Sequence, residues 1–419
     1  MIKKILVFTF IWIITILIAI VWTFENPEKV EIVKSIFEKE KIPEIKIPDK
    51  NTQEFIANSF SIKAEKVLDL SEKTAFLIYK DKNDIFDEKK LEIFTQNGIL
   101  IKNLKPKKIN FPDNFTLQRN GGVKTIISYN EKRIALISSR EKNCFFASLF
   151  LINDEKELFR SACLPEVAKN NDFNGLGSSN VHYENKILFS LGTPEKHASK
   201  NSLLAQLDNS KFGKILQINK DKLNNTINNS SNNLEISIFS KGHRVPQGLT
   251  ILNNEVFNVE HGPKGGDELN KVEEGKNYGW PKVSYGTNYL KDNGGDGSSF
   301  SINHEQNNFE EPLFAFVPSV GISSLNNCPQ VIKDYYKKNC LIALSLYGNN
   351  LRKGHSLIIF LLNDKLNKVD SIEKIQLGNL VLRHFVTDDK NILYEDKSGN
   401  IYVSADKKGI YKIKFYNFR

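Results

Sequence analysis

The sequence has few of the residues that usually build metal centres. It contains four cysteines and seven histidines among 419 residues. It has no Cys-x-x-Cys motif and no cluster of cysteine with histidine, which are the spacings that a tetrahedral zinc site requires. The sequence therefore argues against a zinc-dependent enzyme and against a zinc-stabilised fold.

Clusters of basic with aromatic residues are also lacking, although the chain is basic overall. The 58 lysines and arginines exceed the 49 aspartates and glutamates and give a net charge of +9. The lysines are scattered among glutamates and asparagines, which is typical of a solvated surface rather than a nucleic-acid-binding face. We therefore expect no nucleic-acid partner.

A long apolar run near the N-terminus predicts a transmembrane helix. Lys3 and Lys4 precede residues 5–22, which are apolar apart from two threonines and have about the length that crosses a bilayer core. No small-x-small cleavage site is evident, which favours an uncleaved anchor at residues 1–24 over a cleaved signal peptide, the alternative. The lysines before the run predict an inner-membrane anchor with the following chain in the periplasm, or a secreted chain if the signal is cleaved.

The rest of the chain divides into a linker and an all-β domain. Residues 25–54 are rich in glutamate, lysine and proline and are expected to act as a spacer. Residues 55–419 contain short apolar runs separated by turn residues, and the 28 phenylalanines suit a β-rich interior. This pattern is typical of a propeller or a large sandwich, and no repeat of constant period decides between them.

The four cysteines fall into two pairs along the chain. In an exported protein an even number of cysteines predicts disulfides. Cys144 and Cys163 flank a predicted hairpin with its turn near Asn153, so a bridge across the two strands is reasonable. Cys328 and Cys340 would close a small loop. Four unpaired thiols are the alternative.

The densest group of special residues lies between residues 242 and 289. A cluster of hydrogen-bond donors at 243–248 precedes a short predicted strand. Glycines and a proline then break the chain at 262–263 and 265–266, where the backbone could approach a ligand closely. Two carboxylates follow at 267–268, and carboxylates beside exposed carbonyls suit calcium.

This stretch resembles the glucose/sorbosone dehydrogenase family, the soluble quinoprotein aldose dehydrogenases. The matching residues are Arg244, residues 246–248, residues 260–270 and residues 277–281. The resemblance implies a six-bladed β-propeller with its site at the top of the central channel. It also implies pyrroloquinoline quinone (PQQ) and calcium as cofactors, and an aldose or related alcohol as the substrate.

The resemblance also assigns positions to the quinone. These cofactor-binding residues are Asn120, Arg244, Gln247, Tyr289 and Arg383. Because the quinone is a tricarboxylate, arginines are expected to hold it. The alternatives are a buried structural role for Arg244 and a plain glycine turn at Asn120, where the family has glutamine.

Calcium is assigned in the same way to two pairs of residues. The side chain of Glu268 and the backbone carbonyl of Tyr278 match the family's calcium positions, and Gly262 and Pro263 could offer carbonyls to a second ion at the quinone. The alternative is a loop held by hydrogen bonds of Glu268 alone.

One catalytic part of the family pattern is absent. The segment 174–181 corresponds to the motif that carries the family's catalytic histidine, and Leu176 or a direct neighbour occupies the position of that histidine. His182, the nearest histidine, is expected to be an ordinary strand residue. Loss of a general base typically lowers a rate by about 10²–10⁴-fold.

Two functions therefore stay open. The first is a membrane-anchored quinoprotein that oxidises an aldose or related alcohol with PQQ and calcium, and the retained cofactor positions favour it. The second is a calcium-binding propeller without redox chemistry that binds a glycan, a protein or another ligand at the same place. The missing histidine favours the second function.

Overall fold

The structure is a computed structural model that describes residues 45–49, 51–81, 85–165, 172–195, 200–229, 234–289, 296–347 and 355–419, with Trp12 and Pro43. The chain forms two units, Met1–Pro43 and Glu44–Arg419. The predicted transmembrane segment 1–24 lies outside the described residues apart from Trp12. Among the described residues, no helix is both long and apolar enough to cross a membrane.

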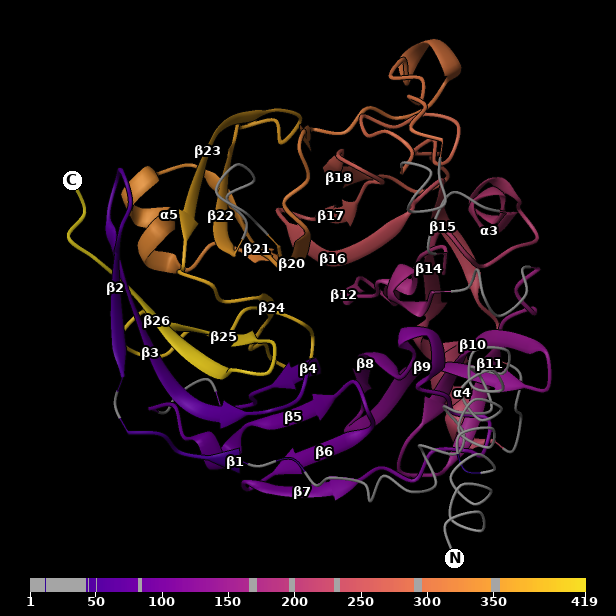
Figure 1. Cartoon of the computed structure of the whole chain (residues 1–419), viewed down its shortest axis with the longest axis horizontal. Coiled ribbons are helices and arrows are strands. Elements are labelled where there is room, and N and C mark those ends of the chain that lie inside the picture. The colour runs from indigo at the N-terminus through magenta and orange to yellow at the C-terminus, as the bar shows by residue number, and fades with distance from the viewer. Residues whose placement is uncertain are drawn as a thin grey trace, which may run out of the picture. The chain divides into compact units, whose positions relative to one another are not determined.

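Six antiparallel sheets surround a common centre in the second unit (Figure 1). Five of them contain four strands that follow one another in the sequence, and we call these sheets blades 1 to 5. The sixth sheet, blade 6, combines strands from both ends of the unit in the order β1-β3-β26-β25-β24, with β2 paired to β3. The prediction of an all-β, six-bladed β-propeller is confirmed, and the sandwich alternative is excluded.

The strand bounds are as follows. Blade 1 contains β4 (Thr74–Ile78), β5 (Glu92–Thr95), β6 (Ile99–Lys102) and β7 (Lys105–Lys108). Blade 2 contains β8 (Val123–Tyr129), β9 (Lys132–Glu141), β10 (Cys144–Leu151) and β11 (Lys156–Arg160). Blade 3 contains β12 (Asn180–Tyr183), β13 (Lys186–Leu191), β14 (Lys214–Asn219) and β15 (Ser237–Lys241).

The remaining blades continue the order of the chain. Blade 4 contains β16 (Val245–Leu252), β17 (Glu255–His261), β18 (Asp267–Val272) and β19 (Phe314–Phe316). Blade 5 contains β20 (Ile322–Asn327), β21 (Asn339–Ser345), β22 (Ser356–Leu362) and β23 (Val369–Gln376). Blade 6 contains β1 (Ile45–Lys46), β2 (Thr52–Ile56), β3 (Ser61–Leu70), β24 (Leu382–Phe385), β25 (Ile401–Ala405) and β26 (Gly409–Tyr416).

Short helices occupy some of the connections. The α-helices are α3 (Lys200–Leu203), α4 (Lys220–Asn228) and α5 (Gln330–Tyr336). The 3-10 helices are η1 (Glu88–Lys90), η2 (Gln118–Asn120), η3 (Phe173–Leu176), η4 (Leu204–Gln206) and η6 (Glu305–Asn307).

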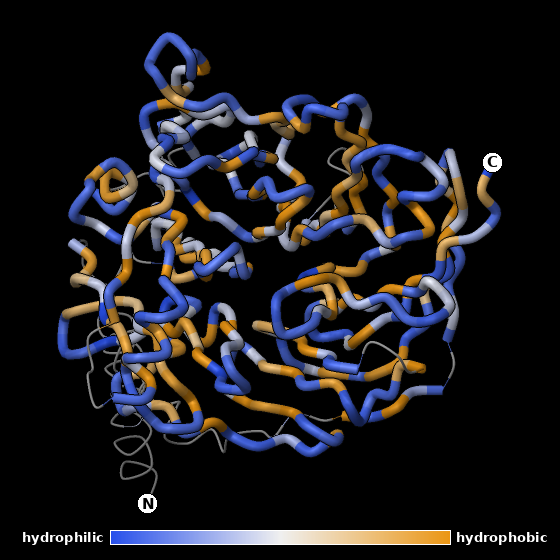
Figure 2. The backbone as a smooth tube through the Cα atoms, turned by 180° about the vertical axis from the view of Figure 1, so that it is seen from behind, coloured by the Kyte–Doolittle hydropathy of each residue, from blue (hydrophilic) through white to orange (hydrophobic). Residues whose placement is uncertain are grey.

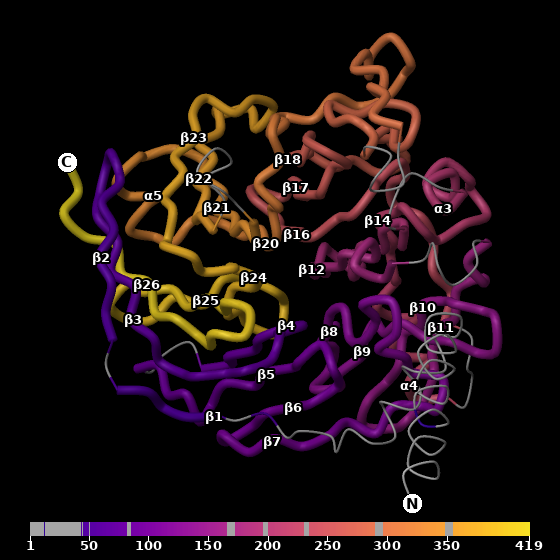
Figure 3. Tube along the Cα trace, in the orientation of Figure 1, coloured from indigo at the N-terminus to yellow at the C-terminus, as the bar shows by residue number. Residues whose placement is uncertain are grey.

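The innermost strands of the blades form the wall of the central channel. These strands are β4, β8, β12, β16, β20 and β24, and each contacts its neighbours around the ring (Figure 3). Residues that are distant in the sequence, such as those at the starts of β4 and β20, therefore face the same channel.

The strands are apolar because the blades pack face to face. Every residue of β22 is buried, and all but Ser356 are apolar. Such continuous runs are typical of strands covered on both faces. Ile127 and Leu149 of blade 2 share one apolar cluster with Phe189 and Leu216 of blade 3. Figure 2 shows apolar residues concentrated along the strands and polar residues at many of the loops.

Both predicted disulfides are present. Cys144 at the start of β10 is bonded to Cys163 beyond β11, and Cys328 is bonded to Cys340. The first bridge therefore joins the two outer strands of blade 2, and the second joins the end of blade 5's innermost strand to its neighbour.

The ring is closed by strands from opposite ends of the unit. β26 near the C-terminus pairs with β3, over a register from Ile410 opposite Leu68 to Tyr416 opposite Ser61. Gly409 begins β26 with a φ of +122°, and a Cβ atom there would lie 1.8 Å from the carbonyl oxygen of Leu68. Glycine is therefore required at this point of the closure.

Gly409→Ala is expected to weaken the ring closure severely, because the added methyl group displaces the backbone of β3. Gly275→Ala is the matched control, since its φ is +81° but nothing lies within 4 Å of a Cβ there. The control should lower the free energy of unfolding by only about 1–2 kcal/mol, the penalty of the left-handed backbone alone. Urea unfolding followed by circular dichroism measures both, and equal losses would contradict the packing argument.

Candidate functional site

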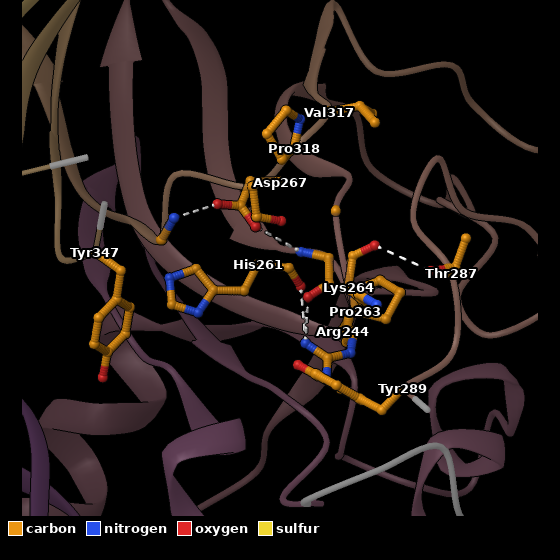
Figure 4. Close-up of a pocket in the computed structure, with 14 residues that line it drawn as sticks. Arg244, His261, Pro263, Lys264, Asp267, Thr287, Tyr289, Val317, Pro318 and Tyr347 are labelled. Atoms are coloured by element: carbon orange, nitrogen blue, oxygen red, sulfur yellow. Dashed lines mark hydrogen bonds between the residues drawn. The ribbon is translucent and has the colours of Figure 1, made fainter. Parts of the chain in front are cut away.

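Two adjoining cavities lie at the starts of the innermost strands. The large cavity, of about 600 Å³, lies between the start of β16, the β17–β18 loop and the approach to β20 (Figure 4). The small cavity, of about 210 Å³, is lined from the starts of β4, β8, β12 and β16 and from β24. His261 and Tyr347 line both cavities, so the two meet at these side chains. All six blades contribute, and the site therefore depends on the complete ring.

Four of the predicted residues line the large cavity. They are Arg244, Gly262, Pro263 and Tyr289. Arg244 is 7% exposed, and its Nη1 donates to the carbonyl oxygens of Gly262 at 2.6 Å and His261 at 3.3 Å. Its Nε is buried and has no hydrogen-bond partner among the described residues.

The other three residues predicted to bind the quinone lie outside the large cavity. Gln247 and Arg383 line the small cavity rather than the large one. Asn120 lines neither, but its carbonyl accepts a hydrogen bond of 2.7 Å from Lys124 Nζ, which lines the small cavity. Asn120 Nδ2 donates to Asp172 at 3.0 Å. The predicted cofactor residues are thus distributed around both cavities.

Asp267 holds the wall of the large cavity in place. One carboxylate oxygen accepts hydrogen bonds from the backbone N–H groups of Val320, Gly321 and Ile322, at 3.0, 2.6 and 3.1 Å. The other accepts from Gly262 N at 3.2 Å. One side chain therefore ties the β17–β18 loop of blade 4 to the start of β20 in blade 5.

The histidines at the cavities differ from the sequence expectation. Leu176 is fully buried at the position of the family's base, and His182 bonds to the carbonyl of Ser128 at 2.9 Å as an ordinary strand residue. His261 lines both cavities instead, and its Nε2 has no hydrogen-bond partner within the described part of the chain. His384 lines the small cavity.

Both of these histidines are neutral at ordinary pH. Burial lowers the pKa of His261, and the charge of Arg244 lowers it further against the opposing charge of Asp267. Burial, aided by the charge of Arg383, lowers the pKa of His384 to about 3. Sequence analysis did not identify His261, although it directly precedes the Gly262–Pro263 turn.

Glu268 lies away from both cavities, in a buried polar cluster on the face of blade 4 that packs on blade 3. It stands opposite Glu260 across β17 and β18, and Asn258 stands opposite Asn270 two residues further along. Residues two apart on a strand share a face, so these four side chains form two adjacent cross-strand pairs. The two carboxyl groups are 3% and 7% exposed, and both asparagines are fully buried.

Tyr278 belongs to the same cluster. Its ring stacks on that of His243 with 4.7 Å between the ring centroids, and His243 Nδ1 lies 3.1 Å from Glu260 Oε2. The Tyr278 hydroxyl donates to the carbonyl of Lys271 at 2.7 Å. The structure therefore brings Tyr278 into the same buried cluster as Glu268, through His243 and Glu260.

The cluster offers oxygen ligands to a cation. The Oδ1 atoms of Asn258 and Asn270 have no hydrogen-bond partner among the described residues, and they lie beside the two carboxyl groups. Carboxylate and amide oxygens suit calcium. No group of three or more histidine, cysteine, aspartate or glutamate side chains in the described ranges is placed to hold a metal, so a cation here would need amide or backbone oxygens as well.

The cluster predicts how the stability of the calcium-free protein, measured in the presence of a chelator, depends on pH. Burial raises the pKa of Glu260 to about 8 and the pKa of Glu268 well above its usual range. The folded chain therefore keeps protons that the unfolded chain releases above about pH 4.3. The contribution of this pair to the free energy of unfolding should therefore fall from about pH 5 to pH 8, by about 1.4 kcal/mol per pH unit for each retained proton. The buried histidines and lysines change the total in the opposite direction, so the contribution is measured as the difference between the wild type and Glu268→Gln.

Urea unfolding at several pH values measures this slope. Glu268→Gln should flatten it, because the amide has no proton to release, whereas Glu155→Gln at an exposed turn should leave it unchanged. A difference between the wild type and Glu268→Gln that does not change with pH would contradict the interpretation.

Comparison with known proteins agrees with this geometry. A family model described as "Glucose / Sorbosone dehydrogenase" matches residues 134–371. The aldose sugar dehydrogenase YliI of Escherichia coli (strain K12) is 37% identical over 94 residues, which are 21% of this chain and 23% of that protein. The match therefore spans less than a quarter of that relative's length.

Solved structures show the same fold at lower identity. The soluble aldose sugar dehydrogenase of Escherichia coli, in its apo-form, has a TM-score of 0.63 at 19% identity, over 84% of this chain and 99% of that one. The PQQ-bound aldose sugar dehydrogenase of Streptomyces coelicolor has a TM-score of 0.54 at 16% identity, over 88% and 100% of the two chains.

Proposed function

The chain belongs to the glucose/sorbosone dehydrogenase family, and on that premise we propose that it oxidises an aldose sugar or related alcohol with PQQ and calcium. The observation that carries the proposal is the placement of Arg244, the Gly262–Pro263 turn and Tyr289 around one cavity of about 600 Å³. A cavity of this volume lies within the range of about 300–1,000 Å³ typical of small-molecule sites.

The large cavity supplies groups that suit a flat polycarboxylate. The Nε of Arg244 has no partner among the residues that the structure describes, and Lys264 adds a second cation to the lining. Arginine and lysine recognise carboxylates through charge-assisted hydrogen bonds. When bound, the quinone would supply the two-electron acceptor, while these residues would bind and orient it.

A neutral histidine at the junction of the cavities suits the role of proton acceptor. Oxidation of a sugar hydroxyl releases a proton, which a neutral imidazole within hydrogen-bond reach can accept. His261 lines both cavities, and its lowered pKa keeps it unprotonated. We therefore assign to His261 the role that the family gives to the histidine replaced here by Leu176.

Calcium would have two places in this proposal. Gly262 and Pro263 line the large cavity, where a cation would have to share the Gly262 carbonyl with Arg244, and the cluster of Glu268 offers carboxyl and amide oxygens. Displacement of protons from Glu260 and Glu268 by a cation would convert two neutral acids into ligands. Calcium bound in the cluster would therefore stabilise the fold.

We also propose that residues 1–24 anchor the protein in the inner membrane with the propeller in the periplasm. The apolar run and the preceding lysines support the anchor. Two disulfides, Cys144–Cys163 and Cys328–Cys340, support an oxidising compartment for the propeller.

A propeller without redox chemistry is the second candidate. The observation that favours it is Leu176, which is fully buried at the position of the family's base. This candidate predicts that calcium raises the melting temperature while PQQ does not bind.

Calorimetric titration of PQQ into the full-length protein with calcium present separates the two candidates. We expect about one quinone per chain, and we expect Arg244→Met to weaken binding by about tenfold or more, since a charge-assisted hydrogen bond is lost. Arg160→Met is the matched control, because Arg160 forms ion pairs with Glu141 and Glu157 and lines neither cavity. Absence of quinone binding would favour the non-redox propeller.

His261→Asn tests the assignment of the proton acceptor. The variant should lower the rate of dye-linked aldose oxidation by about 10²–10⁴-fold and leave the Kd for PQQ unchanged, because the imidazole acts on the substrate. His182→Asn is the matched control and should keep the wild-type rate. A wild-type rate in His261→Asn would assign the proton transfer to another group.

A further inference from the structure

The small cavity is basic. Lys73, Lys124 and Arg383 line it, and none of the lining residues that the structure describes is an aspartate or glutamate. The three cations come from the starts of β4 and β8 and from β24, which are neighbouring innermost strands of blades 1, 2 and 6. Residues from three blades therefore concentrate positive charge in one cavity.

The protein itself neutralises only part of this charge. Arg383 pairs through Nε and Nη2 with Asp406, which fixes the guanidinium at the cavity wall. Lys124 Nζ donates to the carbonyl oxygen of Asn120. The carboxylate of Asp172, whose charge also acts on Lys124, already accepts hydrogen bonds from two other groups. Lys73 has no ion-pair partner among the described residues.

The electrostatic consequence falls on Lys124. Burial, together with the smaller effects of the Arg383 and Lys73 charges and against the opposing charge of Asp172, lowers the pKa of Lys124 to about 7. The like charges therefore oppose protonation of Lys124 in the empty cavity. An anion between the three cations would remove this repulsion and favour the charged form of the lysine.

A neutral donor completes the set. Ser178 is 3% exposed and lines the small cavity, and its hydroxyl has no hydrogen-bond partner among the residues that the structure describes. A buried hydroxyl without a partner is unfavourable unless a ligand or water satisfies it. The small cavity thus presents three cations and one hydroxyl, and this combination suits the two oxygens of a carboxylate.

The size of the cavity limits what enters it. Its volume of about 210 Å³ is below the range of about 300–1,000 Å³ for whole small-molecule ligands. It adjoins the large cavity at His261 and Tyr347. A ligand could therefore place one acidic group in the small cavity while its remaining atoms occupy the large one.

We propose that the small cavity is a carboxylate-binding site in which Lys73, Lys124 and Arg383 hold the acid group of a ligand bound across both cavities. This inference rests on the proposed function, because the carboxylate then belongs either to the quinone or to a sugar acid that serves as substrate. The shared chemistry is a carboxylate, and the two sources can be separated by experiment.

Calorimetric titration of the full-length protein with glucuronate, glucose and PQQ in separate experiments provides the test. If the substrate supplies the carboxylate, glucuronate binds at least about tenfold more tightly than glucose, and Lys124→Met and Lys73→Met remove this preference. If the quinone supplies it, the same two variants weaken PQQ binding by about tenfold or more and glucuronate shows no preference. Lys365→Met, at an exposed turn that lines neither cavity, should change nothing.

The pH dependence gives an independent readout. Because Lys124 is charged only below about pH 7 in the empty cavity, the Kd of the carboxylate ligand should rise as the pH is raised from about 7 to 9, by up to about tenfold per pH unit. Lys124→Met should abolish this rise.

The proposal is overturned if neither ligand responds to the two lysine variants. That result differs from failure of the proposed function. Quinone binding and aldose oxidation that are insensitive to Lys73 and Lys124 would leave the dehydrogenase intact and remove the carboxylate site. Lysine-dependent binding of glucuronate without any quinone binding would support the carboxylate site and remove the quinone-dependent dehydrogenase.

Discussion

The structure depends on the closure of its ring by the pairing of β26 with β3. Each blade has two apolar faces, and both faces are covered only when every blade has a neighbour on each side. The innermost strands of all six blades also supply the cavities, so an open ring would expose the core and separate the site into parts. The close contact of Gly409 with the Leu68 carbonyl lies at this junction.

Within the closed ring, the buried carboxyl groups of blade 4 lie in two different environments. Asp267 is fully engaged, since its two oxygens accept four backbone N–H groups and fix the loops around the large cavity. Glu260 and Glu268 are the opposite case, because burial raises their pKa and the adjacent asparagine oxygens have no hydrogen-bond partner in the described part of the chain. The first carboxylate defines the shape of the cavity, whereas the second pair is suited to respond to a cation.

The fold and part of the site could be predicted from the sequence because their signals are local. The residues from Arg244 to Tyr289 are close in the sequence, and their turn chemistry and family motif place several of them correctly around one cavity. The cysteine pairs are also local, and each joins adjacent strands of one blade.

The remaining features depend on the closed ring and could not be read from local patterns. Lys73, Lys124 and Arg383 are separated by more than 300 residues at the extremes, and only the meeting of blades 6, 1 and 2 brings them to one cavity. The separation of Glu268 from the cavities follows from strand alternation on β18, where Asp267 faces blade 5 and Glu268 faces blade 3. A one-residue shift in the pairing register of β18 would exchange the faces of the sheet on which these two carboxyl groups lie.

Oxidation of a hydroxyl group needs a proton acceptor even where the family's histidine is absent. A proton acceptor must lie beside the bound substrate and stay neutral, and neither condition specifies a particular strand. Leu176 has no atom that can accept a proton, whereas His261 lies where the cavities meet and its pKa is lowered by burial and by Arg244. The geometry therefore favours a relocated base over a cavity without chemistry.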